Sequence, residues 1–299
     1  MAAPPTPLQI DYIDPDGNDW NLGDESMQNG YACSAITGIE GLPVSMQTIP
    51  MLDGTSIPSL YLPQPGTITI AIAVTRPASG LEGDYYANLD AVARAFYNRR
   101  NEQPAPGYLR IQRPDGSSRQ VAVYTTSGLN TPEVGISNDT IYTLTLQTPD
   151  PYWSDLIQQT ANYSISPASG ILPLLPVFLA GSTVIGTNTV VNGGNAQAWP
   201  IWTITGPGTP TMQNLTTGRK WSMNTVIQAG HVVQVVTKPG QQMVVDTTTG
   251  ANMWDNLVLS SLRDLWSLMA GSNQISIAMS GSTLATSVNL AWTNRWNRA

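Results

Sequence analysis

The sequence predicts a mainly β protein made of two β-sandwich domains, the first carrying one packed α-helix. Only 11% of the 299 residues are charged, against roughly 25% in ordinary soluble proteins, while Gly, Pro, Ser, Thr and Asn are abundant. This composition favours short strands and many turns over long helices. The chain is about twice the length of a typical domain, so we expect two hydrophobic cores.

Charge is divided unevenly between the two halves. Residues 1–155 hold 17 acidic and 7 basic side chains, a net charge of −10, whereas residues 156–299 hold 3 and 6, a net charge of +3. We therefore expect a first domain at 1–155, a Ser-, Pro- and Gly-containing linker at 156–175 and a second domain at 176–299. The acidic first domain would repel nucleic acid. The most apolar part of the linker region, 171–178, is too short to span a membrane.

Two hairpins and one strand are predicted in the first domain. Residues 8–22 turn at Asp14-Pro15-Asp16-Gly17, and residues 108–124 turn at Arg113-Pro114-Asp115-Gly116. In both turns Pro presets a negative φ and Gly accepts a positive one. Residues 67–74 alternate between Thr or Ala and larger apolar side chains, which predicts a half-buried strand.

One helix is predicted at about 82–100. Its apolar residues recur at helical spacing and form a single stripe: Leu81, Tyr85, Leu89, Val92 and Phe96. Glu82 and Asp84 lie near its start and Arg94, Arg99 and Arg100 near its end, as the helix dipole favours. The stripe should cover one face of a sheet.

The segment 141–153 predicts a strand that ends the first domain. Thr and larger side chains alternate from Ile141 to Leu146, and Pro149 and Pro151 then prevent further strand pairing. Beyond the linker, short strand candidates separated by turns predict a second sandwich of the jelly-roll kind, at 182–191, 198–205, 211–215, 220–224, 232–237, 242–246, 273–278 and 287–292. Residues 257–269 fit either a short helix or a strand.

Catalytic chemistry has little support in the sequence. His231 is the only histidine and Cys33 the only cysteine, so a multi-histidine metal site, an intrachain disulfide and a thiolate metal cluster all lack partners. We also expect no Ser-His-Asp triad, because the sequence places no partners in named roles around His231. We interpret His231 as a turn residue and Cys33 as a small buried apolar residue. No Gly-rich phosphate loop with a Lys is present. We predict no catalytic, cofactor-binding or metal-binding residue and no enzyme activity.

Two sequence patterns could indicate a binding site, and each also has a purely structural explanation. Asp14, Asp16, Asn18 and Glu25 match positions 1, 3, 5 and 12 of a calcium loop, but Asp19 replaces the Gly of position 6, and a hairpin turn explains the same residues. Seven of the nine tryptophans follow residue 190. They would suit a sugar-stacking face, a sandwich core or a subunit interface.

Two short motifs resemble one known family. The first is Tyr142–Trp153, whose turn contains Asp150, Pro151, Tyr152 and Trp153. The second is Val191–Pro200, with Asn192, Gly193, Asn195 and Pro200. In this order they resemble the strand that closes the first domain, and the opening of the galectin-like second domain, of siphovirus distal tail proteins.

The resemblance implies a structural role in a phage virion. Members form a six-membered ring of first domains at the end of the tail tube, with the second domains outward, so the implied partners are further copies, the tail-tube protein and the tail hub or tip protein. Neither nucleic acid nor a membrane is an expected partner, no cofactor is implied, and no secretion signal is seen at 1–7, which fits assembly in the host cytoplasm. A glycan-binding host-attachment module is the alternative, and a tail-associated hydrolase is the least supported.

Overall fold

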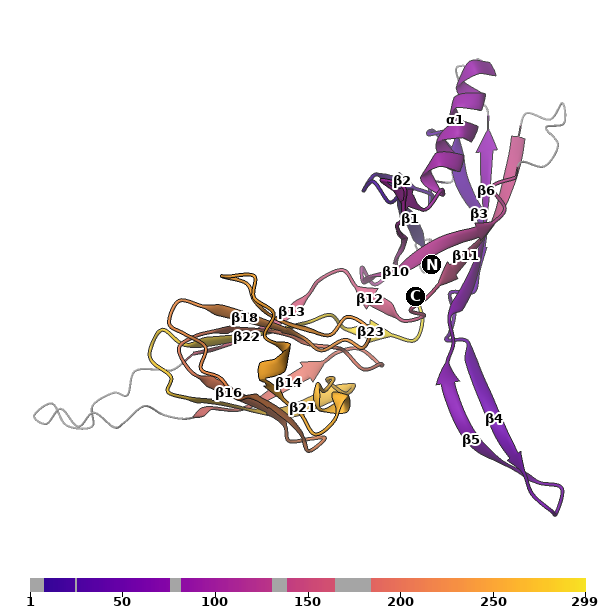
Figure 1. Ribbon diagram of the computed structural model, residues 1–299. Coiled ribbons are helices and arrows are strands. Elements are labelled where there is room, and N and C mark those ends of the chain that lie inside the picture. Colours follow the sequence, from indigo (N-terminus) through magenta and orange to yellow (C-terminus); the bar gives the residue numbers. More distant parts are fainter. Residues whose placement is uncertain (1–7, 25, 76–81, 131–138, 165–183) are drawn as a thin grey trace, which may run out of the picture. The chain divides into compact units, whose positions relative to one another are not determined.

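The computed structural model describes residues 8–24, 26–75, 82–130, 139–164 and 184–299 (Figure 1). Two compact units are present, Met1–Leu156 with Trp296–Ala299 as unit 1 and Ile157–Arg295 as unit 2. The mainly β fold class is confirmed. Residues 296–299 return to unit 1, whereas all of 176–299 was expected in the second domain.

A nine-stranded sheet forms unit 1, and the neighbouring strands of its main order pair antiparallel. The main strand order is β2 (Asp19–Asn21), β1 (Gln9–Ile13), β9 (Gly107–Gln112), β10 (Ser118–Ser127), β11 (Asp139–Thr148), β6 (Gly66–Thr75) and β3 (Tyr31–Thr37). Two short strands extend it beside β10: β12 (Trp153–Asp155) and β23 (Arg295–Trp296). Both predicted hairpins, β1–β2 and β9–β10, are confirmed.

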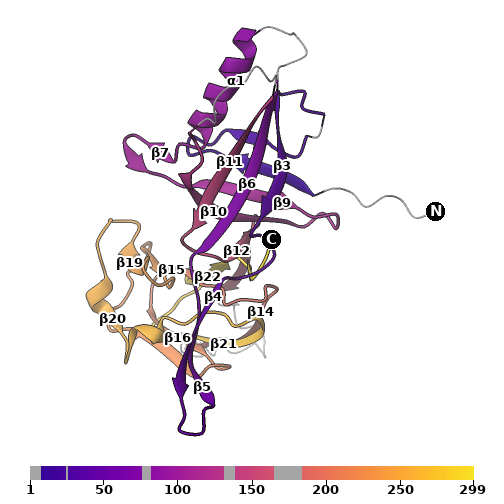
Figure 2. The ribbon, with the colours of Figure 1, turned by 90° about the vertical axis from the view of Figure 1, so that its right-hand side faces the viewer.

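The sheet encloses its core by folding at β10. The first half of β10 pairs with β9 and the second half with β11, so the strands on the two sides of β10 face each other (Figure 2). Ile68, Ile70 and Ile72 of the predicted strand β6 are all buried in this core. Tyr12 of β1 stacks on Phe96 in the same core, with ring centres 4.0 Å apart.

The helix α1 (Glu82–Ala95) is shorter than predicted. Tyr85, Leu89, Val92 and Phe96 are buried in the core as their spacing predicted. Leu81 and the side chains of residues 82–84 lie outside the description. Arg99 and Arg100 are not helical but form β7 (Arg99–Arg100), which pairs with β8 (Gln103–Pro104). The chain leaves the helix because the Asn98 side chain accepts a hydrogen bond from the Thr125 N–H of β10 at 2.6 Å.

Unit 2 is a sandwich of two five-stranded antiparallel sheets. One has the order β13 (Gln159–Ser164), β22 (Ser287–Trp292), β15 (Ile201–Thr205), β18 (Val232–Val236) and β19 (Met243–Asp246). The other has the order β14 (Val184–Asn192), β21 (Gly271–Ser280), β16 (Thr209–Asn214), β17 (Arg219–Met223) and β20 (Leu257–Val258). Three fully buried tryptophans lie in its core, with Trp202 edge-on to both Trp221 and Trp266.

Two expectations for unit 2 differ from the structure. Residues 159–164, assigned to the linker, form β13, because their whole length pairs with β22; residues 165–175 lie outside the description, as does Ser182. Residues 257–269 do not form one helix. They hold β20 and the 3₁₀ turn η2 (Leu262–Asp264), preceded by η1 (Trp254–Asn256). Among the described helices, none has the length and apolar character needed to cross a membrane.

Candidate interaction site: the arm and the Arg113 pocket

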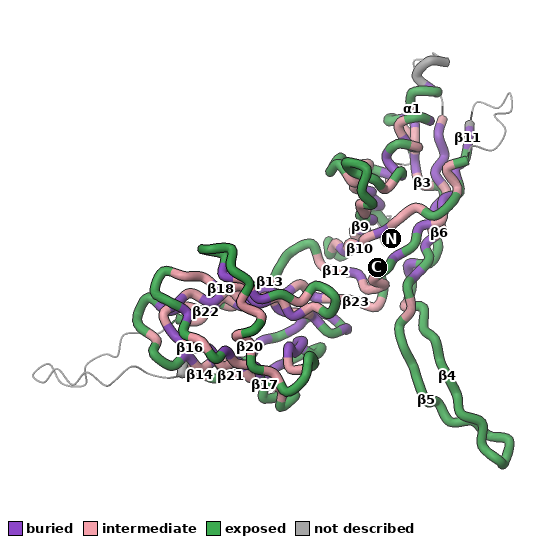
Figure 3. The backbone as a smooth tube through the Cα atoms, in the orientation of Figure 1, coloured by how far each residue is buried: buried purple, intermediate pink, exposed green. Residues whose placement is uncertain are grey.

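Unit 1 has a long hairpin that was not predicted from the sequence. It consists of β4 (Val44–Pro50) and β5 (Ser56–Pro63), and we call it the arm. Every residue of both strands is exposed (Figure 3). Asp53 is its only charged residue. Nine large apolar side chains of the arm are nevertheless exposed: Val44, Met46, Ile49, Met51, Leu52, Ile57, Leu60, Tyr61 and Leu62.

Apolar side chains lie on both faces of the arm. Met46 is opposite Tyr61, and Gln47 is opposite Leu60. Residues opposite each other share a face and successive residues alternate, so these two pairs lie on different faces. A two-stranded ribbon of this kind is at best marginally stable in water, and its edges have unpaired N–H and C=O groups. The arm is therefore suited to being covered by another protein surface.

The tip of the arm is a hydrogen-bonded turn. Gly54 has a φ of +84° and donates its N–H to the Met51 carbonyl at 3.1 Å. The Oδ1 atom of Asp53 accepts hydrogen bonds from the N–H and hydroxyl of Thr55, at 3.0 and 2.6 Å. These bonds lower the pKa of Asp53. The tip thus presents a carboxylate beside the fully exposed side chain of Leu52.

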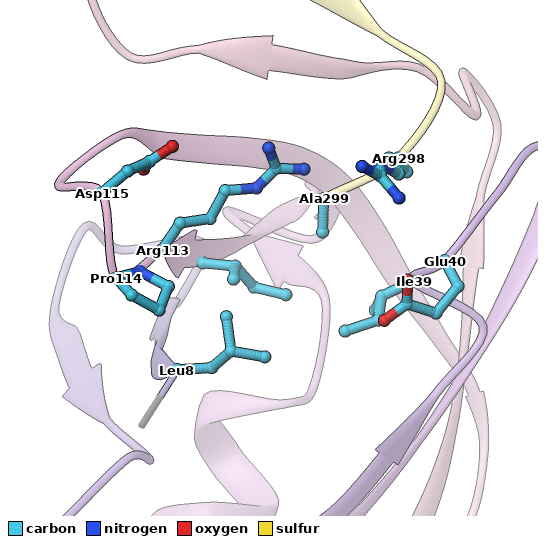
Figure 4. A pocket seen from close by; sticks show the side chains of 9 residues that line it. Leu8, Ile39, Glu40, Arg113, Pro114, Asp115, Arg298 and Ala299 are labelled. Atoms are coloured by element: carbon cyan, nitrogen blue, oxygen red, sulfur yellow. The ribbon is translucent and has the colours of Figure 1, made fainter. Parts of the chain in front are cut away.

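Unit 1 also has a surface pocket of about 380 Å³ (Figure 4). The buried side chains of Ile39 and Ile111 form its apolar floor, and the exposed Leu8 and Pro114 also line it. The rest of the lining consists of two guanidiniums, from Arg113 and Arg298, two carboxylates, from Glu40 and Asp115, and Ala299. The pocket combines an apolar floor with charged groups of both signs.

The pocket is positioned by the β9–β10 turn predicted from the sequence. Gly116 donates its N–H to the Arg113 carbonyl at 2.9 Å, which closes the turn. The Asp115 carboxylate is directed back into the turn, where the N–H and hydroxyl of Ser117 bond to its Oδ1 atom at 2.9 and 2.6 Å and lower its pKa. The guanidiniums of Arg113 and Arg298 form no direct ion pair with any described side chain, although the charge of Arg113 also contributes to the lowered pKa of Asp115. An incoming anion would therefore meet two cations that no described carboxylate contacts directly.

A third arginine holds one wall of the pocket in place. The guanidinium of Arg119 lies over the Trp296 ring and donates hydrogen bonds to the carbonyls of Arg298 and Ala299 at 3.0 and 3.3 Å. Burial and repulsion from Arg113 lower the pKa of Arg119 to about 10. Ala299 in turn donates its N–H to the Ile39 carbonyl at 3.0 Å. These contacts return residues 296–299 to unit 1.

The predicted motif residues build turns in both units. Trp153 is buried in the core of unit 1, and the Asp150 side chain accepts a 3.4 Å hydrogen bond from the Tyr152 N–H, with Pro151 between them. In unit 2, the buried Asn192 side chain donates to the carbonyls of Ala196 and Leu268 and accepts from the Gly194 N–H.

The other residues of the second motif have distinct positions. Gly193 donates its N–H to the Asn294 side chain at 3.1 Å, and the Pro200 carbonyl accepts the hydroxyl of Thr237 at 2.7 Å. Asn195 is exposed. Asn192 is the last residue of β14 and Gly193 begins the loop that follows it, both in unit 2, whereas the turn at Asp150 lies in unit 1. Their role as family features stays a prediction.

The described residues that match the calcium-loop pattern form a hairpin turn. Asp14 accepts hydrogen bonds from the N–H groups of Asp16 and Asn18 and from the side chains of Asn18 and Trp20. Burial alone would raise the pKa of Asp14, but these bonds outweigh it and lower the pKa. Glu25 lies outside the description. Among the described residues, no group of three or more His, Cys, Asp or Glu side chains could hold a metal ion.

The single histidine of the sequence bonds to an aspartate. His231 Nδ1 lies 2.7 Å from Asp246 Oδ2, and this hydrogen bond is the main reason that the pKa of Asp246 is lowered to about 2. His231 also donates its backbone N–H to the Gln228 carbonyl, as a turn residue does.

Cys33 was expected to be buried and is only half-buried, because it lies at a bulge in the edge strand β3.

Most of the tryptophans after residue 190 are buried. Four are buried, at 202, 221, 266 and 292, and three are half-buried, at 199, 254 and 296. Trp296 belongs to unit 1 and is covered by Arg119. The core interpretation accounts for the buried four.

Comparisons with known proteins find similarity in structure alone. No protein-family model and no curated protein matches the sequence. The crystal structure of the SPP1 Dit protein, described as a paradigm of hub adsorption apparatus in Gram-positive infecting phages, matches with a TM-score of 0.66 and 11% identity, over 97% of this chain and 99% of that chain. A chain of the phage P2 baseplate in its activated conformation with Ca matches with a TM-score of 0.51 and 10% identity, over 98% of this chain and 100% of that chain. The chain therefore has the fold of phage hub and baseplate proteins over nearly its whole length, as the sequence motifs implied.

Proposed function

We propose that this chain is a structural component of a bacteriophage tail tip, where copies of it form a ring that joins the tail tube to the tail hub or tip protein. Its place is then the virion, after assembly in the host cytoplasm, and its role requires no catalytic step or cofactor. The shared fold with a hub adsorption protein and a baseplate protein supports this role. Six copies are expected, from the family that the sequence motifs resemble.

The exposed arm is the main structural support for this proposal. An exposed ribbon with apolar side chains on both faces and one charged residue is costly for a protein that works alone. It is useful in a ring, where each copy covers the exposed strands of its neighbour and closure leaves no free interface. The alternative glycan-binding role has less support, because no described tryptophan of unit 2 is exposed.

Light scattering coupled to size exclusion, followed by negative-stain imaging, tests the ring. We expect a particle of about six times the 32.0 kDa chain mass, with a central hole in end views. A matched variant that replaces residues 44–63 by a short Gly-Ser turn should keep its fold by circular dichroism and lose the ring. A single 32.0 kDa species at every concentration would contradict the proposal.

Immunogold labelling of intact particles tests the location. Antibody raised against the purified chain should mark the end of the tail that is distant from the capsid. Gold on the capsid instead would overturn the assignment to the tail tip.

A further inference from the structure

We propose that the tip of the arm of one copy binds in the Arg113 pocket of the next copy, with Leu52 on the apolar floor and Asp53 paired with the guanidiniums of Arg113 and Arg298. This inference rests on the proposed ring and specifies the contact that holds neighbouring copies together. The occupant is thus a second copy of this chain.

The chemistry of the two surfaces is complementary. The tip carries one fully exposed apolar side chain, Leu52, directly beside the only carboxylate of the arm. The pocket offers an apolar floor and two guanidiniums without a described ion-pair partner (Figure 4). At about 380 Å³ it lies near the small end of the roughly 300–1,000 Å³ range of ligand pockets, which suits one or two side chains.

The charges of the pocket are compatible with this pairing. Glu40 and Asp115 also line it. Ser117 bonds to the Oδ1 atom of Asp115 just as Thr55 bonds to the Oδ1 atom of Asp53, so the Oδ2 atom of Asp53 is the one that would face the guanidiniums. The buried guanidinium of Arg119 lies behind the wall formed by Arg298 and Ala299 and adds a third positive charge. Carboxylate–guanidinium pairing is favourable where the groups are partly shielded from water.

The geometry excludes a tip that binds its own pocket. Ile39 and Glu40 of the pocket precede the first residue of β4, so the pocket lies at the base of the arm. The seven residues of β4 extend the tip by about 24 Å, at roughly 3.4 Å per residue. The tip can therefore reach only another copy. Because tip and pocket are different surfaces, each copy offers one and receives one, which is the head-to-tail contact that generates rings.

Charge exchange between two full-length variants tests the contact. Asp53→Arg should weaken assembly because its tip repels the native pocket, and Arg113→Asp should weaken assembly because its pocket repels the native tip. We expect a loss of at least tenfold in the assembly constant for each, measured by light scattering over a dilution series. An equimolar mixture should assemble again, since the native tip fits the native pocket and the reversed tip fits the reversed pocket.

A matched control and a direct probe complete the test. Asp16→Arg makes the same charge change at the tip of another turn in unit 1 and should leave assembly unchanged. In a Cys33→Ser background, Leu52→Cys with Pro114→Cys should give disulfide-linked oligomers between chains under mild oxidation, because Cys33 is the only native cysteine. Circular dichroism should show the wild-type fold for every variant.

The outcomes separate this inference from the ring itself. If wild type forms rings while both charge variants assemble normally, or while the cysteine pair stays unlinked, the tip–pocket contact is wrong and the ring stands. Rescue in the mixture together with interchain crosslinks supports the contact. A wild-type chain that stays monomeric overturns both proposals.

Discussion

The guanidinium of Arg119 lies 3.7 Å from the centre of the Trp296 ring, and this contact fixes residues 296–299 on unit 1. The Trp296 Nε1–H also donates to Asp155 at 2.6 Å, so one side chain joins β10, β12 and β23. Unit 1 therefore includes residues from both ends of the described chain.

Replacement of Trp296 should destabilise unit 1. Trp296→Ala removes the ring under Arg119, the bond to Asp155 and apolar contact with the core, and we expect a loss of about 2 to 3 kcal/mol in urea unfolding. Trp296→Phe keeps a ring and loses only the N–H donor, so about 1 kcal/mol is expected. Equal stability of the alanine variant and wild type would show that this contact contributes nothing.

The β1–β2 turn should depend on the charge of Asp14. Asp14→Asn replaces an acceptor of four hydrogen bonds by a group with one acceptor oxygen, so we expect a loss of about 1 to 3 kcal/mol. Asp16→Asn, an exposed change in the same turn, should cost less than about 0.5 kcal/mol. Chemical denaturation at pH 7 measures both. Similar losses for the two variants would argue against a special role for Asp14.

The His231–Asp246 bond should make unit 2 sensitive to acid. The pKa of Asp246 is lowered to about 2, so the stability that its ionised form contributes is present above about pH 4 and is lost as the pH falls toward 2. His231→Gln should raise the pKa of Asp246 toward its ordinary value and reduce this pH dependence. Carboxyl carbon shifts in an NMR titration report the pKa directly. Asp255→Asn is the control, and an unchanged Asp246 titration in His231→Gln would rule out the histidine as the cause.

The loop after β14 should depend on the Asn192 side chain. Asn192→Ala leaves the Gly194 N–H and the carbonyls of Ala196 and Leu268 without that buried partner, so unit 2 should lose about 2 to 4 kcal/mol. Val191→Ala, at an exposed neighbouring position, should change stability by less than about 0.5 kcal/mol. Thermal unfolding followed by near-ultraviolet circular dichroism distinguishes them. A loss confined to Val191→Ala would contradict the assignment.

Local signals in the sequence were sufficient for part of the fold. The two Pro-Asp-Gly turns, the alternation of β6 and the stripe of α1 each reflect short-range chemistry, and the structure contains each of them. The arm escaped prediction because both its faces are exposed, so no period-2 division of polar and apolar residues marks its strands. Its Asp53-Gly54 turn was the available signal.

Contacts between residues far apart in the chain explain where the structure differs from the sequence predictions. The helix stops short because Asn98 bonds to β10, and residues 159–164 become a strand because β22 offers a full-length partner. The Arg113 pocket joins a turn, a loop and residues 298–299, which are far apart in the chain. Only its turn was predictable from local sequence. The pairing of Arg119 with Trp296 likewise leaves no local signal.

The return of residues 296–299 to unit 1 has a consequence for folding of the chain. Residues 296–299 are made after the whole of Ile157–Arg295, although they pack on strands that are made before it. The contact between Arg119 and Trp296 therefore closes a loop that contains all of unit 2. Contacts between residues this far apart in the chain form slowly, so the wall of the pocket that contains Arg298 is completed late in folding.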